Sequence, residues 1–208
     1  RWRGVSKIDH LIISHADNDH IGGLDALQSA FDISQILSSR IDKIPGATAC
    51  MAGQAWVVSG VAFSIVSPAQ GGPQGSNNLS CVLRIDNYAY SALITGDIEK
   101  PIERYLLNSK QLLKSDFVLV PHHGSKSSST LDFIDAVQPA LGLISAGYLN
   151  HYGHPHPKVV ERYRSRRIEL LSTIDSGSIL LEINPIGWSY SAFRTANRRF
   201  WHRQKKPN

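Results

Sequence analysis

The chain has 208 residues, of which 42% are hydrophobic and 19% are charged, with 22 Lys and Arg against 17 Asp and Glu. This composition excludes a disordered or collagen-like chain, and no apolar run is long enough to span a membrane. Half of the basic side chains lie in two stretches, 158–167 and 194–208. We therefore predict one domain over residues 1–208 with a basic C-terminal tail at 194–208. A basic surface attracts polyanions, although a solvated helix face is the alternative.

Short apolar strands alternate with helices along the chain, which is typical of an α/β fold. We predict a strand at 8–14, a helix at 22–31 and a second αβ unit over 31–39. Antiparallel strands are expected within 55–67, 81–85 and 88–95, around a glycine-rich loop at 69–78. Further helices are expected at 100–113, 131–137 and 158–167, and further strands at 117–120, 141–145 and 179–183.

The chain contains two cysteines, Cys50 and Cys81, which is too few for a disulfide scaffold. They can form one bridge in an oxidising compartment. Two separate buried thiols are the favoured expectation.

Segment 15–20 carries four side chains that can bind metal, directly after an apolar strand. On this strand-to-helix turn His15 and Asp17 can point one way, while Asp19 and His20 face another side. The turn can therefore serve two adjacent metal ions. A polar loop with an N-capping aspartate is the alternative, but two His and two Asp at this spacing favour metal binding.

Three more polar sites follow later strands. Asp97 ends the TGD segment at 95–97, where a lone aspartate is most often a helix N-cap. His122 and His123 follow another strand and suit a metal or acid–base site, and the loop at 150–157 contains three histidines. Seven of the nine histidines lie within these sites or the 15–20 segment, which favours one composite metal centre.

The HADNDH segment at 15–20, followed by Ile-Gly-Gly, resembles the first metal motif of the metallo-β-lactamase superfamily, H-x-H-x-D-H, with Asp17 replacing the second His. NNLS at 77–80, TGD at 95–97, PHHGS at 121–125 and YGHP at 152–155 follow in the order of the C-terminal domain of the ComEC DNA-internalisation (competence) proteins. The resemblance covers about residues 8–183. It implies an α/β fold, the metallo-β-lactamase αββα sandwich lacking its first strands.

The resemblance also implies a dinuclear centre of two divalent metal ions, Mn²⁺ or Zn²⁺, and no small organic cofactor. Mixed imidazole and carboxylate ligands suit these ions, and Asp17 makes the site harder, which favours Mn²⁺. The ligands carried over motif by motif are His15 and Asp17 for one ion, Asp19 and His20 for the second, Asp97 as a bridge, one of His122 and His123 for the first ion, and His154 for the second.

Two such ions activate water and neutralise the phosphoryl oxygens of an in-line displacement. Asp97 and Asp19 are expected catalytic residues, and Asp19 would orient the attacking water or accept its proton. His122 and His123 complete the catalytic set, because the member of the pair that binds no metal would protonate the leaving group. The sequence leaves open which of the two this is.

The basic stretches fit a phosphodiester substrate better than a lactam, because a small neutral antibiotic needs no field of cations. The serine-rich segment after the histidine pair can donate hydrogen bonds to phosphate, or it can be a flexible polar loop. The expected nucleic-acid-binding residues are Ser125, Lys126, Lys158, Arg162, Arg166 and Arg167.

We therefore predict a metal-dependent DNA nuclease associated with DNA uptake in natural transformation, with single-stranded or duplex DNA as its partner. A small-molecule phosphodiesterase of the same superfamily and a non-catalytic nucleic-acid-binding fragment are the alternatives. The resemblance implies a parent protein in the bacterial cytoplasmic membrane, whose channel domain is absent from this chain. The segment itself would be a soluble domain on a side of the membrane that the sequence does not give.

Members of the superfamily carry two or three strands before the first metal motif. We therefore expect an N-terminally truncated domain in which part of one sheet is unpaired and apolar.

Overall fold

The larger of two central sheets has seven strands in the computed structural model, which describes residues 4–109 and 111–197. Its strands are β4 (Ala55–Val58), β5 (Val61–Ser67), β6 (Val82–Asp86), β7 (Ser91–Ile94), β8 (Phe117–Leu119), β9 (Leu141–Ile144) and β10 (Glu169–Ser172). Strands β4 to β7 pair antiparallel in chain order. Strands β7 to β10 are parallel, so their carboxyl ends lie along one edge.

A smaller parallel sheet packs against the antiparallel part of the larger one, with order β1 (Lys7–Ile13), β2 (Asp32–Ser38), β3 (Thr48–Ala49). Alternation along the strands divides their side chains between two cores. Ile12 and Leu37 face the large sheet and pack in a cluster with Ile65. Ile13 and Ile36 face away, toward α1 (Asn18–Ile21) and α2 (Leu24–Ala30).

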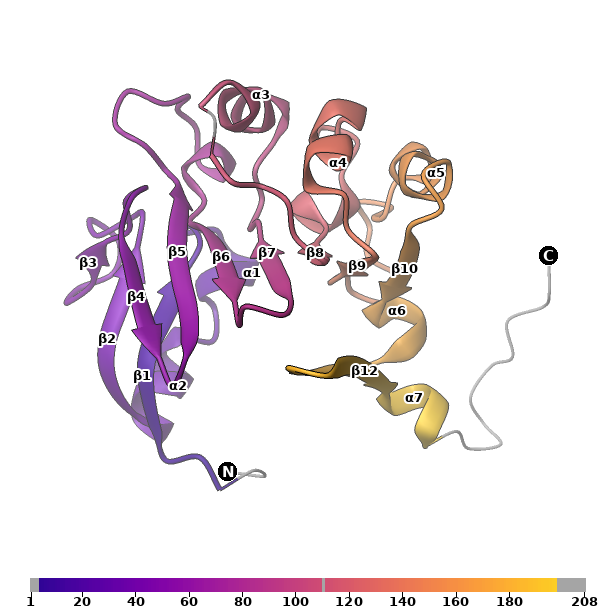
Figure 1. The fold of residues 1–208 in the computed structure, drawn as a ribbon. Coiled ribbons are helices and arrows are strands. Elements are labelled where there is room, and N and C mark those ends of the chain that lie inside the picture. The colour runs from indigo at the N-terminus through magenta and orange to yellow at the C-terminus, as the bar shows by residue number, and fades with distance from the viewer. Residues whose placement is uncertain (1–3, 110, 198–208) are drawn as a thin grey trace.

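Three helices lie side by side along the other face of the large sheet (Figure 1): α3 (Lys100–Asn108), α4 (Leu131–Val137) and α5 (Pro157–Arg164). Their apolar stripes enter the largest core cluster, in which Leu106, Phe133 and Val159 are completely or almost completely buried. Each such side chain contributes roughly 1.5–3 kcal/mol through burial. The order of layers is helix, sheet, sheet, helix, which confirms the expected αββα sandwich.

The C-terminal part adds a separate hairpin of β11 (Ile179–Asn184) and β12 (Gly187–Ala192). Trp188 of this hairpin contacts Phe117 edge to face, with ring centroids 5.2 Å apart. The short helices are η1 (Asn77–Leu79), η2 (Pro121–Gly124), α6 (Thr173–Ser176) and α7 (Phe193–Ala196). The strand expected at 179–183 is therefore present but pairs outside the main sheet, and β10 and β12 were not predicted.

Two predicted helices extend beyond the observed ones. The helix predicted at 100–113 ends at Asn108, where the Ser109 hydroxyl donates to the Leu106 carbonyl at 2.8 Å and caps the last turn. The helix predicted at 158–167 covers Pro157–Arg164. Arg167 has a φ of +59°, which is incompatible with continuing a right-handed helix.

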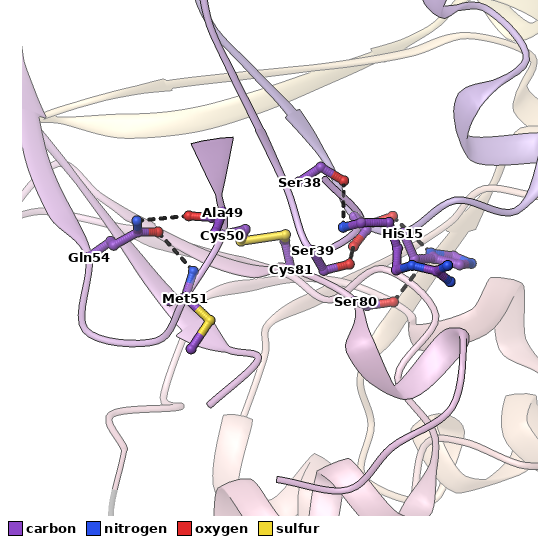
Figure 2. Close-up of a disulfide and its surroundings, with 11 residues drawn as sticks. His15, Ser38, Ser39, Ala49, Cys50, Met51, Gln54, Ser80 and Cys81 are labelled. Atoms are coloured by element: carbon purple, nitrogen blue, oxygen red, sulfur yellow. Dashed lines mark hydrogen bonds between the residues drawn. A yellow bond between two sulfur atoms is a disulfide. The ribbon is translucent and has the colours of Figure 1, made fainter. Parts of the chain in front are cut away.

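A disulfide joins Cys50, which follows β3, to Cys81, which precedes β6 (Figure 2). The expectation of two separate thiols is therefore wrong, although both residues are buried as expected. Packing of one sheet on the other brings the two Cα atoms to 6.1 Å, a distance suited to a disulfide. This proximity depends on the stacking of the sheets, which the sequence separation of 31 residues does not reveal.

Within the described ranges, β1 is an edge strand of the small sheet, with β2 as its partner on one side. No helix of the described residues has the length and apolar character needed to cross a membrane.

Candidate metal centre

Four polar segments meet where strands end. The 15–20 segment follows β1, Asp97 follows β7, His122 and His123 follow β8, and the loop bearing His154 follows β9. Since β7, β8 and β9 are parallel, their carboxyl ends bring three of these segments to one edge. The Cys81 N–H donates to the Ser14 carbonyl at 2.8 Å and attaches the β1 segment to the large sheet.

Gly96 allows the β7 end to approach the β1 end closely. Its φ is +56°, and a Cβ atom there would lie 2.9 Å from side-chain atoms of both Ser14 and Ser80. Only glycine fits this position without displacing its neighbours. The contact brings Asp97 next to the histidines that follow β1.

Asp97 lies at the centre of the assembled side chains, and its own side chain is 7% exposed. One carboxylate oxygen is 3.3 Å from His20 Nε2, and the other is 3.3 Å from His123 Nε2. Burial opposes ionisation of this carboxyl group, but the two imidazoles outweigh it and hold the pKa of Asp97 well below its usual range. His122 Nε2 and His15 Nε2 lie farther away, at 3.8 and 4.0 Å.

Asp19, His20, Asp97 and His123 each offer one ligand atom, and these four atoms lie within 4.8 Å of one another. Asp19 is 63% exposed, and its Oδ2 is 3.2 Å from His123 Nε2 and 3.7 Å from His20 Nε2. Metal–ligand bonds of this type are about 2.0–2.2 Å long, so donors this close together can reach one ion. The four residues form what we call the four-ligand cluster.

His15 and Asp17 lie beside the four-ligand cluster. The His15 side chain is completely buried, and its Nε2 is 3.5 Å from Asp17 Oδ2. Its ring centroid is 4.1 Å from that of His20. Asp17 accepts a 2.6 Å hydrogen bond from the Ser76 hydroxyl. His15 and Asp17, expected to bind one ion, therefore lie next to Asp19 and His20, expected to bind the other.

Serine side chains orient these histidines, and Ser14 contacts two of them. Its Oγ is 3.1 Å from His15 Nδ1 and 3.0 Å from His20 Nδ1. Ser80 Oγ accepts the Asp97 N–H at 3.0 Å and lies 3.3 Å from His15 Nδ1 (Figure 2). Partners on Nδ1 fix the ring and direct Nε2 into the centre, as is usual for metal-binding histidines.

His123 is also fixed through its Nδ1, but by a backbone group. The Nδ1 atom is 2.7 Å from the Ser145 carbonyl, and the Nε2 atom faces the carboxylates. No role for Ser14 or Ser145 is predicted from the sequence. Their positions at the ends of β1 and β9 are the only sequence signal that could have indicated one.

Three imidazole nitrogens of the described residues are buried without a hydrogen-bond partner: Nε2 of His15, Nε2 of His20 and Nδ1 of His154. An unsatisfied buried nitrogen is costly unless it binds something. The orphaned nitrogens and the adjacent carboxylates therefore fit a divalent metal ion.

The pKa values of the histidines diverge. Burial and the nearby His20 lower the pKa of His15, and burial lowers that of His154. The Asp97 carboxylate instead raises the pKa of His123 to about 9. The first two imidazoles are therefore neutral near pH 7, whereas His123 must lose a proton before it can bind a metal.

The structure separates the two members of the histidine pair, which both have positive φ angles. His123 belongs to the four-ligand cluster, beside the side chains expected at the second ion. His122 turns its Nδ1 to Glu99 Oε1 at 3.4 Å and to Ser127 Oγ at 3.3 Å. Glu99 was not singled out in the sequence.

His154 lies in the loop that follows β9. Its ring centroid is 5.8 Å from that of His122 and 6.5 Å from that of His123. The neighbouring His156 has a different position, because its Nδ1 accepts the Lys158 N–H and caps α5.

The expected nucleic-acid-binding residues divide into two groups. Arg162 donates to the carbonyls of Ser128 and Ser129 at 2.8 and 2.9 Å, and Arg166 forms a two-pronged pair with Asp135. The other four are Lys126, Lys158 and Arg167, which are exposed, and Ser125, which is partly buried. Of the basic tail, residues 198–208 lie outside the described ranges.

Comparison with known proteins matches the chain to one superfamily and to several competence-related relatives. A family model described as the metallo-beta-lactamase superfamily matches residues 3–148. The chain is 34% identical over 98% of its length to the competence protein ComA of Neisseria gonorrhoeae, and 32% identical over 85% to the ComE operon protein 3 of Bacillus subtilis. It is also 34% identical over 83% of its length to the recombination protein 2 of Haemophilus influenzae. These alignments confirm the resemblance to competence proteins.

The chain spans 22% to 29% of the length of these three relatives. A solved structure of the CmlA beta-hydroxylase E377D mutant has a TM-score of 0.52 at 13% identity, covering 80% of this chain and 43% of that one, so it shows a shared fold. With the match over 3–148 and the αββα layers, the chain belongs to the metallo-β-lactamase superfamily, whose scaffold is that of metal-dependent hydrolases.

Proposed function

We propose that the chain is a metal-dependent nuclease domain that hydrolyses DNA phosphodiester bonds during DNA uptake. The observation that carries this proposal is the four-ligand cluster, in which two imidazoles and two carboxylates meet at the ends of strands from both sheets. The chain is similar to competence proteins, and this similarity favours DNA over other phosphodiesters as the substrate.

Two divalent ions, Mn²⁺ or Zn²⁺, fit the available donors. His15 with Asp17 would hold the first ion, and the four-ligand cluster would hold the second, with Asp97 close to both. His154 lies beside the cluster and would complete it through the nitrogen that has no other partner. When bound, such ions lower the pKa of water and neutralise phosphoryl oxygens.

Two side chains at the rim would transfer protons in this mechanism. Asp19 is exposed, so its carboxylate can orient the attacking water or accept its proton. His122 is held through its Nδ1 by Glu99 and Ser127, and it can protonate the departing oxygen. The exposed Lys126 and Lys158 and the partly buried Ser125 would contact the neighbouring phosphates.

The parent protein would lie in the bacterial cytoplasmic membrane, as the competence-related names of the relatives favour. DNA is the proposed partner.

Cleavage of a labelled DNA strand in the presence of Mn²⁺ tests this proposal. We expect chelation to abolish cleavage and Asp97→Asn to reduce it by at least about 100-fold, since the central carboxylate is lost. The matched control is Asp25→Asn, an exposed carboxyl group on α2, which should cleave at the normal rate. Hydrolysis of bis(p-nitrophenyl) phosphate without cleavage of DNA would instead support a small-molecule phosphodiesterase.

A further inference from the structure

Tyr152 is an exposed aromatic side chain next to the metal centre. It is 73% exposed, although a large apolar ring is usually covered in a folded protein. Its loop also exposes Tyr148 and Leu149, at 59% and 82%. Neither the metal-ligand set nor the proton-transfer roles described above account for these side chains.

A chain of rings connects Tyr152 to the four-ligand cluster. Its ring is nearly parallel to that of His154, at an angle of 17° and a centroid distance of 5.7 Å. His154 in turn is nearly parallel to His123, at 23° and 6.5 Å. The ring centroid of His151 is 4.0 Å from that of Tyr152. The exposed tyrosine therefore stacks directly on His154, and the His154 ring lies between it and His123 of the four-ligand cluster.

The loop that carries Tyr152 is held firmly in place. Asn150 closes it, because its side chain donates to the His154 carbonyl at 2.7 Å and accepts the His154 N–H at 2.9 Å. The C-terminal end of the loop contacts η2, which carries His122 and His123, because the His156 N–H donates to the Gly124 carbonyl. A Cβ atom on Gly124 would lie 2.7 Å from Pro155, so the two segments are in direct contact.

We propose that Tyr152 is a stacking platform for an unpaired nucleobase next to the scissile phosphate, which makes single-stranded DNA the substrate. A fixed, exposed ring beside a phosphate-binding centre matches the way in which single-strand binders combine aromatic stacking with backbone contacts. A paired base has both faces occupied within the duplex and is unavailable to such a ring. The inference rests on the proposed nuclease function and adds its strand preference.

The test compares oligothymidylate with an abasic strand of the same length and backbone. The normal protein should have a KM about tenfold lower for oligothymidylate. Tyr152→Ala should raise that KM to the abasic value while leaving abasic cleavage unchanged, and Tyr152→Phe should behave like the normal protein. The matched control is Tyr88→Ala, an 84% exposed tyrosine in the β6–β7 turn, at the opposite end of β7 from Asp97.

A binding measurement separates this inference from the nuclease proposal. With chelator present to prevent hydrolysis, a single strand containing 2-aminopurine should be quenched by the normal protein and by Tyr152→Phe, but not by Tyr152→Ala. Equal KM values for the two strands, or quenching that survives in Tyr152→Ala, would overturn the platform. Failure to cleave any strand, with quenching intact, would overturn the nuclease proposal alone.

Discussion

At the scale of single residues, serine hydroxyl groups contact the histidines and the backbone of the candidate centre. Ser14 contacts the Nδ1 atoms of both His15 and His20. Ser80 contacts Nδ1 of His15 and also accepts the Asp97 N–H. These bonds hold the imidazoles before any metal arrives, so less ordering is needed on binding.

Ser80→Ala should weaken metal binding by roughly 10- to 100-fold, because Asp97 loses the acceptor of its N–H and His15 loses a neighbour. Titration of the metal-free protein with Mn²⁺ measures the affinity. Ser34→Ala, on the exposed side of β2, is the matched control. Unchanged affinity in Ser80→Ala would show that the hydroxyl does not organise the site.

Metal affinity should also depend on pH through His123, whose pKa near 9 reflects the adjacent Asp97 carboxylate. Metal binding must displace this proton, so the metal affinity should rise by up to about tenfold per pH unit until about pH 9 and then level off. The same raised pKa of His123 also stabilises the folded metal-free protein. This stabilisation is complete below about pH 6.5 and is lost as the pH rises through about 9. Calorimetry in buffers of different ionisation enthalpy near pH 7 should detect release of a proton. Binding that shows no pH dependence in this window would contradict the assignment of His123.

At the scale of elements, a buried carboxyl group on α3 and an arginine on α5 hold the serine loop at 125–130 from two sides. Glu103 on α3 is fully buried and accepts the N–H groups of Ser129 and Thr130. Arg162 on α5 holds the same loop through two carbonyls. Burial raises the pKa of Glu103, as expected for a carboxyl group shielded from water. The loop that follows His122 and His123 is thereby anchored on both sides.

Glu103→Ala should lower the free energy of unfolding by at least about 2 kcal/mol, because two backbone N–H groups lose their acceptor. Chemical denaturation measures the change. Glu161→Ala, which removes an exposed carboxyl group from α5, should be close to neutral. Equal stability of the two variants would mean that the loop does not need its buried anchor.

The sequence predicted most of these elements, because their apolar periodicity is local. The strand before His15 and the helix at 131–137 occur as expected, and the clustering of histidines indicated a composite centre. The roles of Glu103 and Glu99 were not predictable, since an isolated glutamate on a helix or strand end normally faces water. Strand β10 begins with the exposed Glu169 and forms through pairing with β9, a long-range contact that periodicity does not report.

At the scale of the whole molecule, the disulfide between Cys50 and Cys81 links the two sheets beside His15 and Ser80 of the candidate centre (Figure 2). Cys81 adjoins Ser80 and donates its N–H to the Ser14 carbonyl. The crosslink therefore constrains the same strand ends that carry His15 and approach Asp97.

Reduction of the disulfide should lower the free energy of unfolding by about 3–4 kcal/mol, as the loop-closure model gives for a separation of 31 residues. Denaturation with and without dithiothreitol measures the loss. A Cys50→Ser/Cys81→Ser double variant should resemble the reduced protein and be insensitive to reductant. Two free thiols in the folded, non-reduced protein would contradict the crosslink.

Metal content tests the central claim most directly. Elemental analysis of the protein, stripped with chelator, reloaded with Mn²⁺ or Zn²⁺ and desalted, should find two equivalents per chain. Asp97→Asn should retain less than the normal protein, because both proposed ions depend on its carboxylate. Absence of stoichiometric metal from the normal chain, or two equivalents in Asp97→Asn, would contradict the metal centre on which the proposed hydrolysis rests.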